Sequence, residues 1–416
     1  MIQNLKILLL GYNNLTGVVD LSGMRNLEKL VLENNDFSGP LPDLSDSSSI
    51  QTLRLGNNGF DNLFFPTNYL EMRNMTDLGL NNLDLTGEIP VGIGTLTNLE
   101  ILNLEGNSLN GEITTSLTEL LSLRILTVNN NELSGTIPFE VSFLTNLEIL
   151  DLSFNRFRSM IPVAIRRLTS LKVLKLASNF FEGEILIPIT SLPNLEVLDL
   201  ANNAFIGNVP NSFWDLTSLR KVNLTNNYFA GEISGLIGNL NQLQSFNAAS
   251  NAFRGRIPDR ITSLINLEVL DLSFNFFGGP IPSNIGDLTN LRDLLLGTNY
   301  DESSSSFGLN GSIPSSISKL QNLEKLVLNR NRISGFLPSQ HELLKSVMVY
   351  DVSENEELGG TIPKDFSNMK QLNRLNIFGT NIDGTVPYDF CNRNVAIKVD
   401  CGGATTLKCS CCFCFP

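Results

Sequence analysis

The chain has 416 residues, a formal net charge of -13 and 42% hydrophobic residues. The acidic balance argues against a nucleic-acid partner, because phosphates require a basic surface. No run of 18 apolar residues occurs, so we expect no transmembrane segment in this chain. The large apolar fraction argues against disorder and predicts a long buried core.

A repeat organises the whole sequence. The pattern L-x-x-L-x-L-x-x-N occurs at Leu147–Asn155, Leu195–Asn203 and Leu267–Asn275, and the copies are separated by multiples of 24 residues. Sixteen repeats can be marked by the residue at the last position of the pattern: Asn13, Asn35, Asn58, Leu83, Asn107, Asn131, Asn155, Asn179, Asn203, Asn227, Asn251, Asn275, Asn299, Asn331, Asn355 and Thr380. Such a period predicts a solenoid in which each unit buries its apolar face against its neighbours.

Each repeat is expected to contain one short strand. Leu198 and Leu200, for example, point inward while Asp199 points outward, and consecutive strands should stack in parallel. The Asn that follows can donate and accept hydrogen bonds, so we expect a ladder of Asn side chains that satisfies backbone groups in the bend. Leu83 and Thr380 interrupt this ladder, and we expect local strain there.

A second apolar column lies two residues after each ladder position. In the middle of the chain it consists of Phe157, Phe181, Phe205, Phe229, Phe253 and Phe277. We expect these rings to belong to the core and to stack edge to face. A Gly-x-Ile-Pro segment follows, as at Gly87 to Pro90, where Gly permits a tight turn and Pro suits a first helical turn. The few remaining residues predict only a short helix or 3-10 turn.

The cysteines form a cluster at the end of the chain. All six lie in the last 26 residues: Cys391, Cys401, Cys409, Cys411, Cys412 and Cys414. The cluster predicts an end piece held by disulfides and an oxidising, secretory route. A metal site is the alternative, but no His lies nearby, so we expect no metal. Six cysteines allow 15 pairings, which the sequence leaves open.

These motifs resemble leucine-rich-repeat proteins of the 24-residue plant type, such as receptor-like kinase ectodomains and polygalacturonase-inhibiting proteins. The Cys-rich end resembles the C-terminal caps of leucine-rich-repeat proteins of diatoms. The resemblance implies an α/β solenoid, a right-handed superhelix with a concave parallel sheet and with short helices or 3-10 turns on the convex side. We expect residues 1–390 to form the solenoid and residues 391–416 a cap.

The start of the chain lies inside a repeat, because Leu5 already belongs to the first one. Neither a signal peptide nor the polar cap that a repeat array needs for solubility precedes it. We therefore expect a truncated form of a longer protein that is secreted or anchored in a membrane.

Outward strand positions do not contribute to the core, so they are free to bind a ligand. The candidate ligand-binding residues on the concave face are Asp151, Phe154, Lys175, Asp199, Asn223, Asn247, Asp271 and Phe274. They predict a polar groove with two exposed aromatic side chains, suited to a protein, a peptide or a glycan. Ordinary solvated strand residues are the alternative, because Asp-Leu-Ser is common in the consensus of the family.

Catalysis is not indicated. Asp151 and Asp199 are about 10 Å apart by strand spacing, near the carboxyl separation of inverting glycosidases, but Lys175 lies between them. The only His, His341, has no Ser or Cys partner at a recognisable spacing. We expect no enzyme activity and no cofactor.

Four glycosylation sequons occur, at Asn14, Asn74, Asn223 and Asn310. A glycan on Asn223 would block the concave face, whereas Asn310 is the favoured acceptor because it follows an insertion predicted to be a surface loop (residues 300–306).

We interpret the chain as a non-enzymatic recognition protein, extracellular or at the cell surface, that binds a protein, peptide or glycan on its concave face. The ectodomain of a membrane-anchored receptor and a structural or adhesive cell-surface protein are the alternatives. The sequence identifies neither the ligand nor the oligomeric state.

Overall fold

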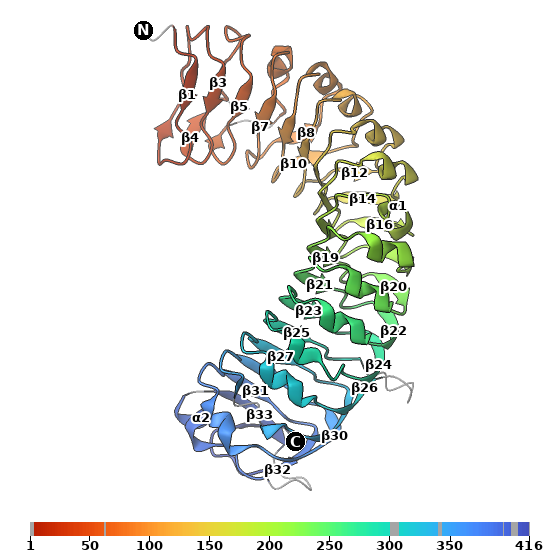
Figure 1. Ribbon diagram of the computed structural model, residues 1–416. Helices are drawn as coiled ribbons and strands as arrows, with labels where there is room; N and C mark the ends of the chain where they lie inside the picture. The colour runs from red at the N-terminus through yellow and green to blue at the C-terminus, as the bar shows by residue number, and fades with distance from the viewer. Residues whose placement is uncertain are drawn as a thin grey trace. The chain divides into compact units, whose positions relative to one another are not determined.

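The computed structural model describes residues 4–61, 64–299, 308–339, 343–393, 395–400 and 407–415 (Figure 1). The chain divides into two compact units, Met1–Phe205 (unit 1) and Ile206–Pro416 (unit 2). The predicted loop at 300–306 and His341 lie outside the described residues, so both predictions stay untested.

Each predicted repeat supplies one short strand to a parallel sheet, here called the main sheet, which confirms the predicted solenoid. In unit 1 its strands are β1 (Ile7–Leu9), β3 (Lys29–Val31), β5 (Thr52–Arg54), β7 (Asp77–Gly79), β9 (Ile101–Asn103), β11 (Ile125–Thr127), β13 (Ile149–Asp151), β15 (Val173–Lys175) and β17 (Val197–Asp199). In unit 2 they are β19 (Lys221–Asn223), β21 (Ser245–Asn247), β23 (Val269–Asp271), β25 (Asp293–Leu295), β27 (Lys325–Val327), β29 (Val349–Asp351) and β31 (Arg374–Asn376). Leu126, Leu150 and Leu174 are fully buried register partners, so equivalent leucines lie side by side in the core.

The Cys-rich segment continues the main sheet of unit 2. After α2 (Tyr388–Asn392), strand β33 (Ala396–Asp400) pairs with β31, and β34 (Phe413–Phe415) pairs with β33, both in parallel. Disulfides join Cys391 to Cys411 and Cys409 to Cys412. The prediction of disulfides is therefore confirmed for these four cysteines. Cys401 and the side chain of Cys414 lie outside the described part of the chain.

The ladder of Asn side chains forms as predicted. Asn155 is buried, and its Nδ2 donates to the carbonyl oxygens of Val128 (2.9 Å), Leu152 (3.1 Å) and Ser153 (3.2 Å). Its Oδ1 accepts from the backbone N–H of Leu133 at 3.0 Å. One amide thus satisfies groups in two neighbouring repeats, which the backbone alone leaves unpaired at the bend. The same bonds recur at Asn107, Asn179, Asn251, Asn275, Asn331 and Asn355.

Neighbouring groups partly replace the two interrupted rungs. Asn107 Oδ1 accepts from the backbone N–H groups of both Leu83 and Leu85, each at 3.0 Å. Thr380 Oγ1 donates to the carbonyl of Ile377 at 2.6 Å. Local strain at Leu83 and Thr380 stays a prediction.

A second set of parallel strands follows the ladder, and we did not predict it. In unit 1 these strands are β2 (Thr16–Gly17), β4 (Asp36–Gly39), β6 (Gly59–Phe60), β8 (Thr86–Glu88), β10 (Ser108–Asn110), β12 (Ser134–Gly135), β14 (Arg156–Met160) and β16 (Phe180–Gly183), and β18 (Ala204–Asn208) contains the boundary between the units. In unit 2 they are β20 (Tyr228–Gly231), β22 (Ala252–Arg256), β24 (Phe276–Pro280), β26 (Gly308–Ser312), β28 (Arg332–Phe336), β30 (Asn355–Thr361) and β32 (Thr380–Asp383). The alternation of exposed and buried residues in Arg156, Phe157 and Arg158 was the available signal.

The Phe column is core, as predicted, but its rings do not pack edge to face. Phe157 and Phe181 lie 5.9 Å apart between ring centroids with an interplanar angle of 7°, and Phe181 and Phe205 lie 6.1 Å apart with an angle of 14°. Phe253 and Phe277 stack in the same way in unit 2. The prediction was wrong because each repeat is nearly a translated copy of the one before it, and translation preserves the orientation of a ring.

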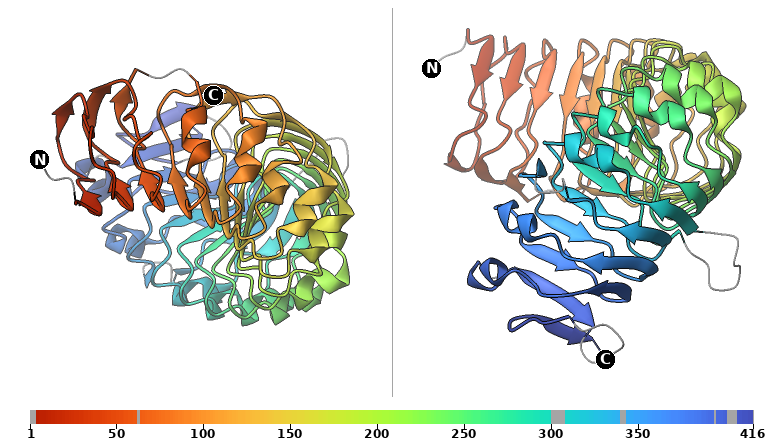
Figure 2. Two further views of the ribbon diagram at one scale, coloured as in Figure 1. Left: turned by 90° about the horizontal axis from the view of Figure 1, so that it is seen from above. Right: turned by 60° about the horizontal axis from the view of Figure 1, so that its bottom comes forward.

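Short turns cover the side of each unit opposite the main sheet, here called the helix face (Figures 1 and 2). In unit 1 they are η1 (Thr67–Glu71), η2 (Val91–Thr95), η3 (Leu117–Glu119), η4 (Phe139–Phe143), η5 (Val163–Arg167) and α1 (Leu186–Ile189). In unit 2 they are η6 (Asn211–Asp215), η7 (Gly235–Asn239), η8 (Asp259–Ser263), η9 (Ile285–Asp287), η10 (Ser315–Lys319) and η12 (Lys364–Asn368).

The Gly-x-Ile-Pro segment makes the bend into these turns. Gly255 has a φ of 83°, a conformation that only Gly adopts without strain. Pro258 then caps η8, and its carbonyl accepts from the N–H of Ile261 at 3.0 Å. The predicted short turns are confirmed, and none of the described helices is long and apolar enough to cross a membrane.

Candidate functional site

A row of aliphatic side chains crosses the main sheet of unit 1. Because strand side chains alternate, the first and third residues of each three-residue strand face away from the core. The first residues of β9, β11, β13, β15 and β17 are all half-buried and apolar, and they are partners in register: Ile101, Ile125, Ile149, Val173 and Val197. We call these five residues the aliphatic row. Sequence reasoning passed over them, although a spacing of 24 residues relates all five.

A polar row runs beside it, formed by the third residues of the same strands. Lys175 Nζ lies 3.2 Å from Asp151 Oδ2, and Lys175 is also the register partner of Asp199. Thr127 Oγ1 donates to Asn103 Oδ1 at 3.0 Å. The structure therefore brings together the three predicted residues Asp151, Lys175 and Asp199.

The aspartates of this row also have a structural role that we did not predict. Asp151 is only 7% exposed, and its Oδ1 accepts from the backbone N–H of Ser153 at 3.1 Å. Asp199 accepts in the same way from Ala201. Such Asx-type bonds shape the bend after the strand. Much less of the Asp151 side chain is therefore accessible to a ligand than its outward strand position suggested.

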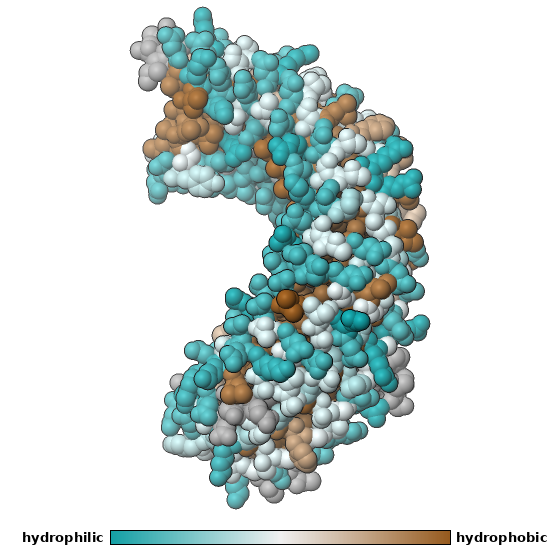
Figure 3. Space-filling view, viewed as in Figure 1, coloured by the Kyte–Doolittle hydropathy of each residue, from teal (hydrophilic) through white to brown (hydrophobic). Residues whose placement is uncertain are grey.

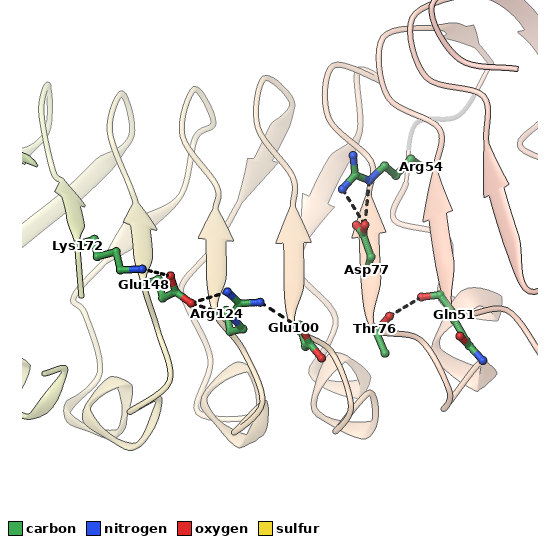
Figure 4. A network of polar contacts seen from close by, with 8 residues as sticks. All are labelled: Gln51, Arg54, Thr76, Asp77, Glu100, Arg124, Glu148 and Lys172. Atoms are coloured by element: carbon green, nitrogen blue, oxygen red, sulfur yellow. Dashed lines mark hydrogen bonds and ion pairs between the residues drawn. The ribbon is translucent and has the colours of Figure 1, made fainter. Parts of the chain in front are cut away.

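A ladder of ion pairs borders the aliphatic row on the side where the strands begin (Figure 4). Arg124 lies 2.6 Å from Glu148 and 3.7 Å from Glu100, and Lys172 lies 2.7 Å from Glu148. These residues precede successive strands, and their signs alternate every 24 residues. Their charges are therefore largely neutralised within the surface. The periodic alternation of sign was readable in the sequence, and we overlooked it.

Glu148 should contribute to stability in a pH-dependent way. Hydrogen bonds from Lys172 and then Arg124 lower the pKa of Glu148 below its ordinary value of 4.5. Folding therefore gains stability from this carboxylate above its unfolded pKa, and this gain is lost as the pH falls through the lower native value. We expect Glu148→Gln to be less stable than wild type at neutral pH, and the difference to shrink as the pH is lowered through the acidic range.

Urea midpoints measured along an acidic pH series will test this prediction. The effect should be small and weaker in high salt, because the pairs are exposed. Glu140→Gln is the matched control, since Glu140 forms no ion pair with any described residue. A constant difference between Glu148→Gln and wild type at every pH would contradict the assignment.

Three aromatic side chains stand out in the bends after the strands, two in unit 1 and one in unit 2. In unit 1, Tyr12 is 76% exposed with a φ of 58° and Phe154 is 55% exposed with a φ of 55°; in unit 2, Phe274 is 57% exposed with a φ of 54°. Equivalent bends carry mainly Asn and Ser, which tolerate this left-handed conformation better than a bulky residue does. An exposed ring held at such a position is a reason to suspect a function.

The predicted residues of unit 2 also lie together. Asn223, Asn247 and Asp271 are register partners on β19, β21 and β23, and all three are half-buried. Asn223 Oδ1 accepts from the N–H of Thr225 at 3.2 Å, and Asp271 Oδ1 accepts from Ser273. Unit 2 has no continuous aliphatic row at the described positions, because Ser245 and Asp293 flank Val269.

The candidate glycan acceptors differ in exposure. Asn14, Asn74 and Asn310 are exposed, whereas Asn223 is half-buried with its amide oxygen already hydrogen-bonded. Glycosylation at each of these residues stays a prediction. The sulfur atoms of Cys391, Cys409 and Cys411 lie within 4.8 Å of one another, but all three belong to disulfides and so offer no thiolate to a metal.

Comparisons with known proteins agree with this architecture. The leucine rich repeat family matches residues 121–181 and 188–229, and a second leucine rich repeat family matches residues 98–120 and 266–288. A comparison with curated proteins found no match.

Several solved structures are similar over nearly the whole chain. A plant peptide hormone receptor, RGFR1 in complex with RGF2, shares 29% identity with a TM-score of 0.84, over 96% of this chain and 63% of that one. PEPR1 with AtPEP1 shares 30% identity with a TM-score of 0.81, over 94% and 58%. The Arabidopsis receptor kinase HAESA, in complex with the peptide hormone IDA and the co-receptor SERK1, shares 29% identity with a TM-score of 0.80, over 96% and 71%.

The chain thus spans about 63% and 58% of the lengths of the first two structures. The segments matched by the two family models all lie within the repeats described above. The chain is a leucine-rich-repeat solenoid that resembles the ectodomains of plant receptor kinases.

Proposed function

We propose that the chain is a recognition protein that binds an extended peptide across the main sheet of unit 1. The observation that carries the proposal is the aliphatic row, which crosses five adjacent strands on a face that the core does not need. Such a row offers apolar contact along a line of about 20 Å at ordinary strand spacing. Five or six extended residues have that length.

The borders of the row suit a peptide better than a rigid apolar ligand. The ion-pair ladder lies on one side, and the polar row with Lys175 and Thr127 lies on the other. Side-chain amide, hydroxyl and ammonium groups can hydrogen-bond the carbonyl and N–H groups of an extended main chain. Phe154 stands next to this face and supplies an exposed aromatic ring, a residue type that is enriched at protein interfaces.

The similar structures support a peptide over the other ligand classes. Two of the three compared above are described as a peptide hormone receptor and as a receptor kinase bound to a peptide hormone. We infer that this chain binds rather than catalyses, and that it works outside the cell or at the cell surface, where its disulfides are stable. Its likeness to receptor ectodomains favours a receptor over an adhesive or structural protein. The unit 2 residues Asn223, Asn247, Asp271 and Phe274 form a second candidate surface.

Binding to a synthetic library of linear peptides, with a glycan array in parallel, will test this function. We expect individual peptides to bind the wild type, and Phe154→Ala to weaken that binding at least about tenfold. A double change, Ile149→Thr with Val173→Thr, should weaken it further, because it removes apolar contact while keeping β-branched residues in the strands.

Two matched controls separate loss of binding from loss of fold. Phe180→Ala removes another exposed Phe, 65% accessible, from the second set of strands, and Ile265→Thr removes an exposed aliphatic residue that follows η8 in unit 2. Neither should change peptide binding. Binding that is confined to the glycan array, or peptide binding that all variants retain, would refute the proposal.

A further inference from the structure

The helix face of unit 1 carries a second, unrelated apolar surface. The surface includes the second residue after the buried Ile of each Gly-x-Ile-Pro segment or its equivalent. In five consecutive repeats this residue is exposed, and it is Val91, Thr115, Phe139, Val163 and Ile187. The four apolar members are 70%, 54%, 62% and 59% exposed, in chain order. Phe143 is the last residue of η4 and is 48% exposed, and Leu121 follows η3 and is 55% exposed. Figure 3 shows hydrophobic side chains along this outer side of unit 1.

In unit 2 the same position carries no aliphatic side chain. Its residues there are Asn211, Gly235, Asp259, Ser283, Ser315, Ser339 and Lys364, followed by Tyr388, which is 71% exposed. The fold therefore does not require an apolar residue at this position, since the same turns form with polar ones. The apolar residues of unit 1 thus point to an interaction of the helix face rather than to a folding need.

Charges are arranged symmetrically around Phe143. Glu119 and Arg167 occupy the same position as Phe143 in the preceding and following repeats, 24 residues away on either side. Both are exposed, and neither forms an ion pair with any described residue. The guanidinium of Arg167 instead lies over the ring of Phe139, 5.8 Å from its centroid. One side of the apolar centre is therefore acidic and the other side is basic.

We propose that this surface binds a second copy of the chain through a two-fold axis near Phe143. A two-fold axis turns one copy around, so that Glu119 of each copy lies against Arg167 of the other while the Phe143 rings meet at the centre. The surface is thus complementary to itself in both charge and polarity. Such complementarity is needed here, because two chains of net charge -13 otherwise repel each other.

The proposed dimer leaves the main sheet free, since the helix face lies on the opposite side of unit 1. Two peptide-binding faces would then be carried by one assembly. The inference does not depend on the proposed function, because it concerns different residues and a different measurement.

Sedimentation velocity of the full chain over a wide concentration range will measure the association. We expect a concentration-dependent dimer, and Phe143→Glu should weaken it at least about tenfold, because the change places two like charges at the centre of the interface. Ile265→Glu, at an apolar residue of unit 2 that follows η8 and is 59% exposed, is the control and should leave the dimer unchanged. Circular dichroism will verify that each variant is folded.

A charge exchange tests the two-fold arrangement itself. Glu119→Arg and Arg167→Glu should each weaken the dimer at least about tenfold, and the double variant should restore it, because the pair is re-formed with reversed signs. In addition, Phe143→Cys should give a disulfide-linked dimer, since a residue on the axis meets its own copy. A wild type that stays monomeric throughout, a dimer that tolerates Phe143→Glu, or a double variant weaker than either single one would overturn the proposal.

Discussion

Replacing Phe181 with Ala should lower the free energy of unfolding by about 3–5 kcal/mol. The side chain is fully buried, and its ring lies between those of Phe157 at 5.9 Å and Phe205 at 6.1 Å. Truncation therefore removes contacts on both faces of the ring and leaves a cavity inside unit 1. A solenoid cannot close such a cavity easily, because each repeat is held in register by its neighbours.

Phe180 provides the matched control on the same strand. It precedes Phe181 on β16, but it is 65% exposed. We expect Phe180→Ala to change the free energy of unfolding by less than about 0.5 kcal/mol. Urea titrations followed by circular dichroism will compare the two variants. Similar losses for both would show that the column is not the core of the repeat.

Replacing Asn155 with Ala should cost about 2–4 kcal/mol, since it leaves several buried backbone groups without a partner. Asn155 donates to Val128, Leu152 and Ser153 and accepts from Leu133, with distances between 2.9 and 3.2 Å. The change should act locally, so hydrogen exchange is the sharpest readout. The amide of Leu133 loses its acceptor and should exchange faster than in the wild type.

Asn146 is the control for this prediction. Its Nδ2 also donates to a carbonyl of the preceding repeat, that of Leu121, at 3.0 Å, but the bond is exposed to water. Asn146→Ala should therefore cost less than about 1 kcal/mol. An unchanged exchange rate at Leu133 in Asn155→Ala would mean that the ladder contributes little to holding the repeats together.

The ladder also matters for the candidate site. Asn155 directly follows Phe154, whose φ of 55° is unfavourable for a bulky side chain. The bonds of Asn155 to the flanking backbone hold the bend that keeps the Phe154 ring exposed. Loss of the Asn155 hydrogen bonds should thus reduce peptide binding as well as stability. Peptide binding at the wild-type level in Asn155→Ala would show that the ladder stabilises the fold without positioning Phe154.

Repeat features were predictable because each depends on spacing alone. The strands, the buried leucines, the Asn ladder and the buried Phe column all follow from a period of 24 residues and from the alternation within a strand. The same reasoning placed Asp151, Lys175 and Asp199 next to one another, and the register of β13, β15 and β17 agrees. The disulfides of Cys391, Cys409, Cys411 and Cys412 were expected from their clustering, but their pairing was not.

The sequence by itself determined the solenoid, its repeat boundaries and the positions that face away from the core, because these follow from short-range periodicity. Only the tertiary structure decided how neighbouring repeats meet. It showed that the Phe rings stack in parallel and that the Asp151 carboxylate accepts a hydrogen bond from the backbone of the bend after its own strand. It also showed that Arg124 links Glu100 to Glu148. Each of these outcomes depends on the displacement and orientation between two repeats, which a pattern along one chain does not contain.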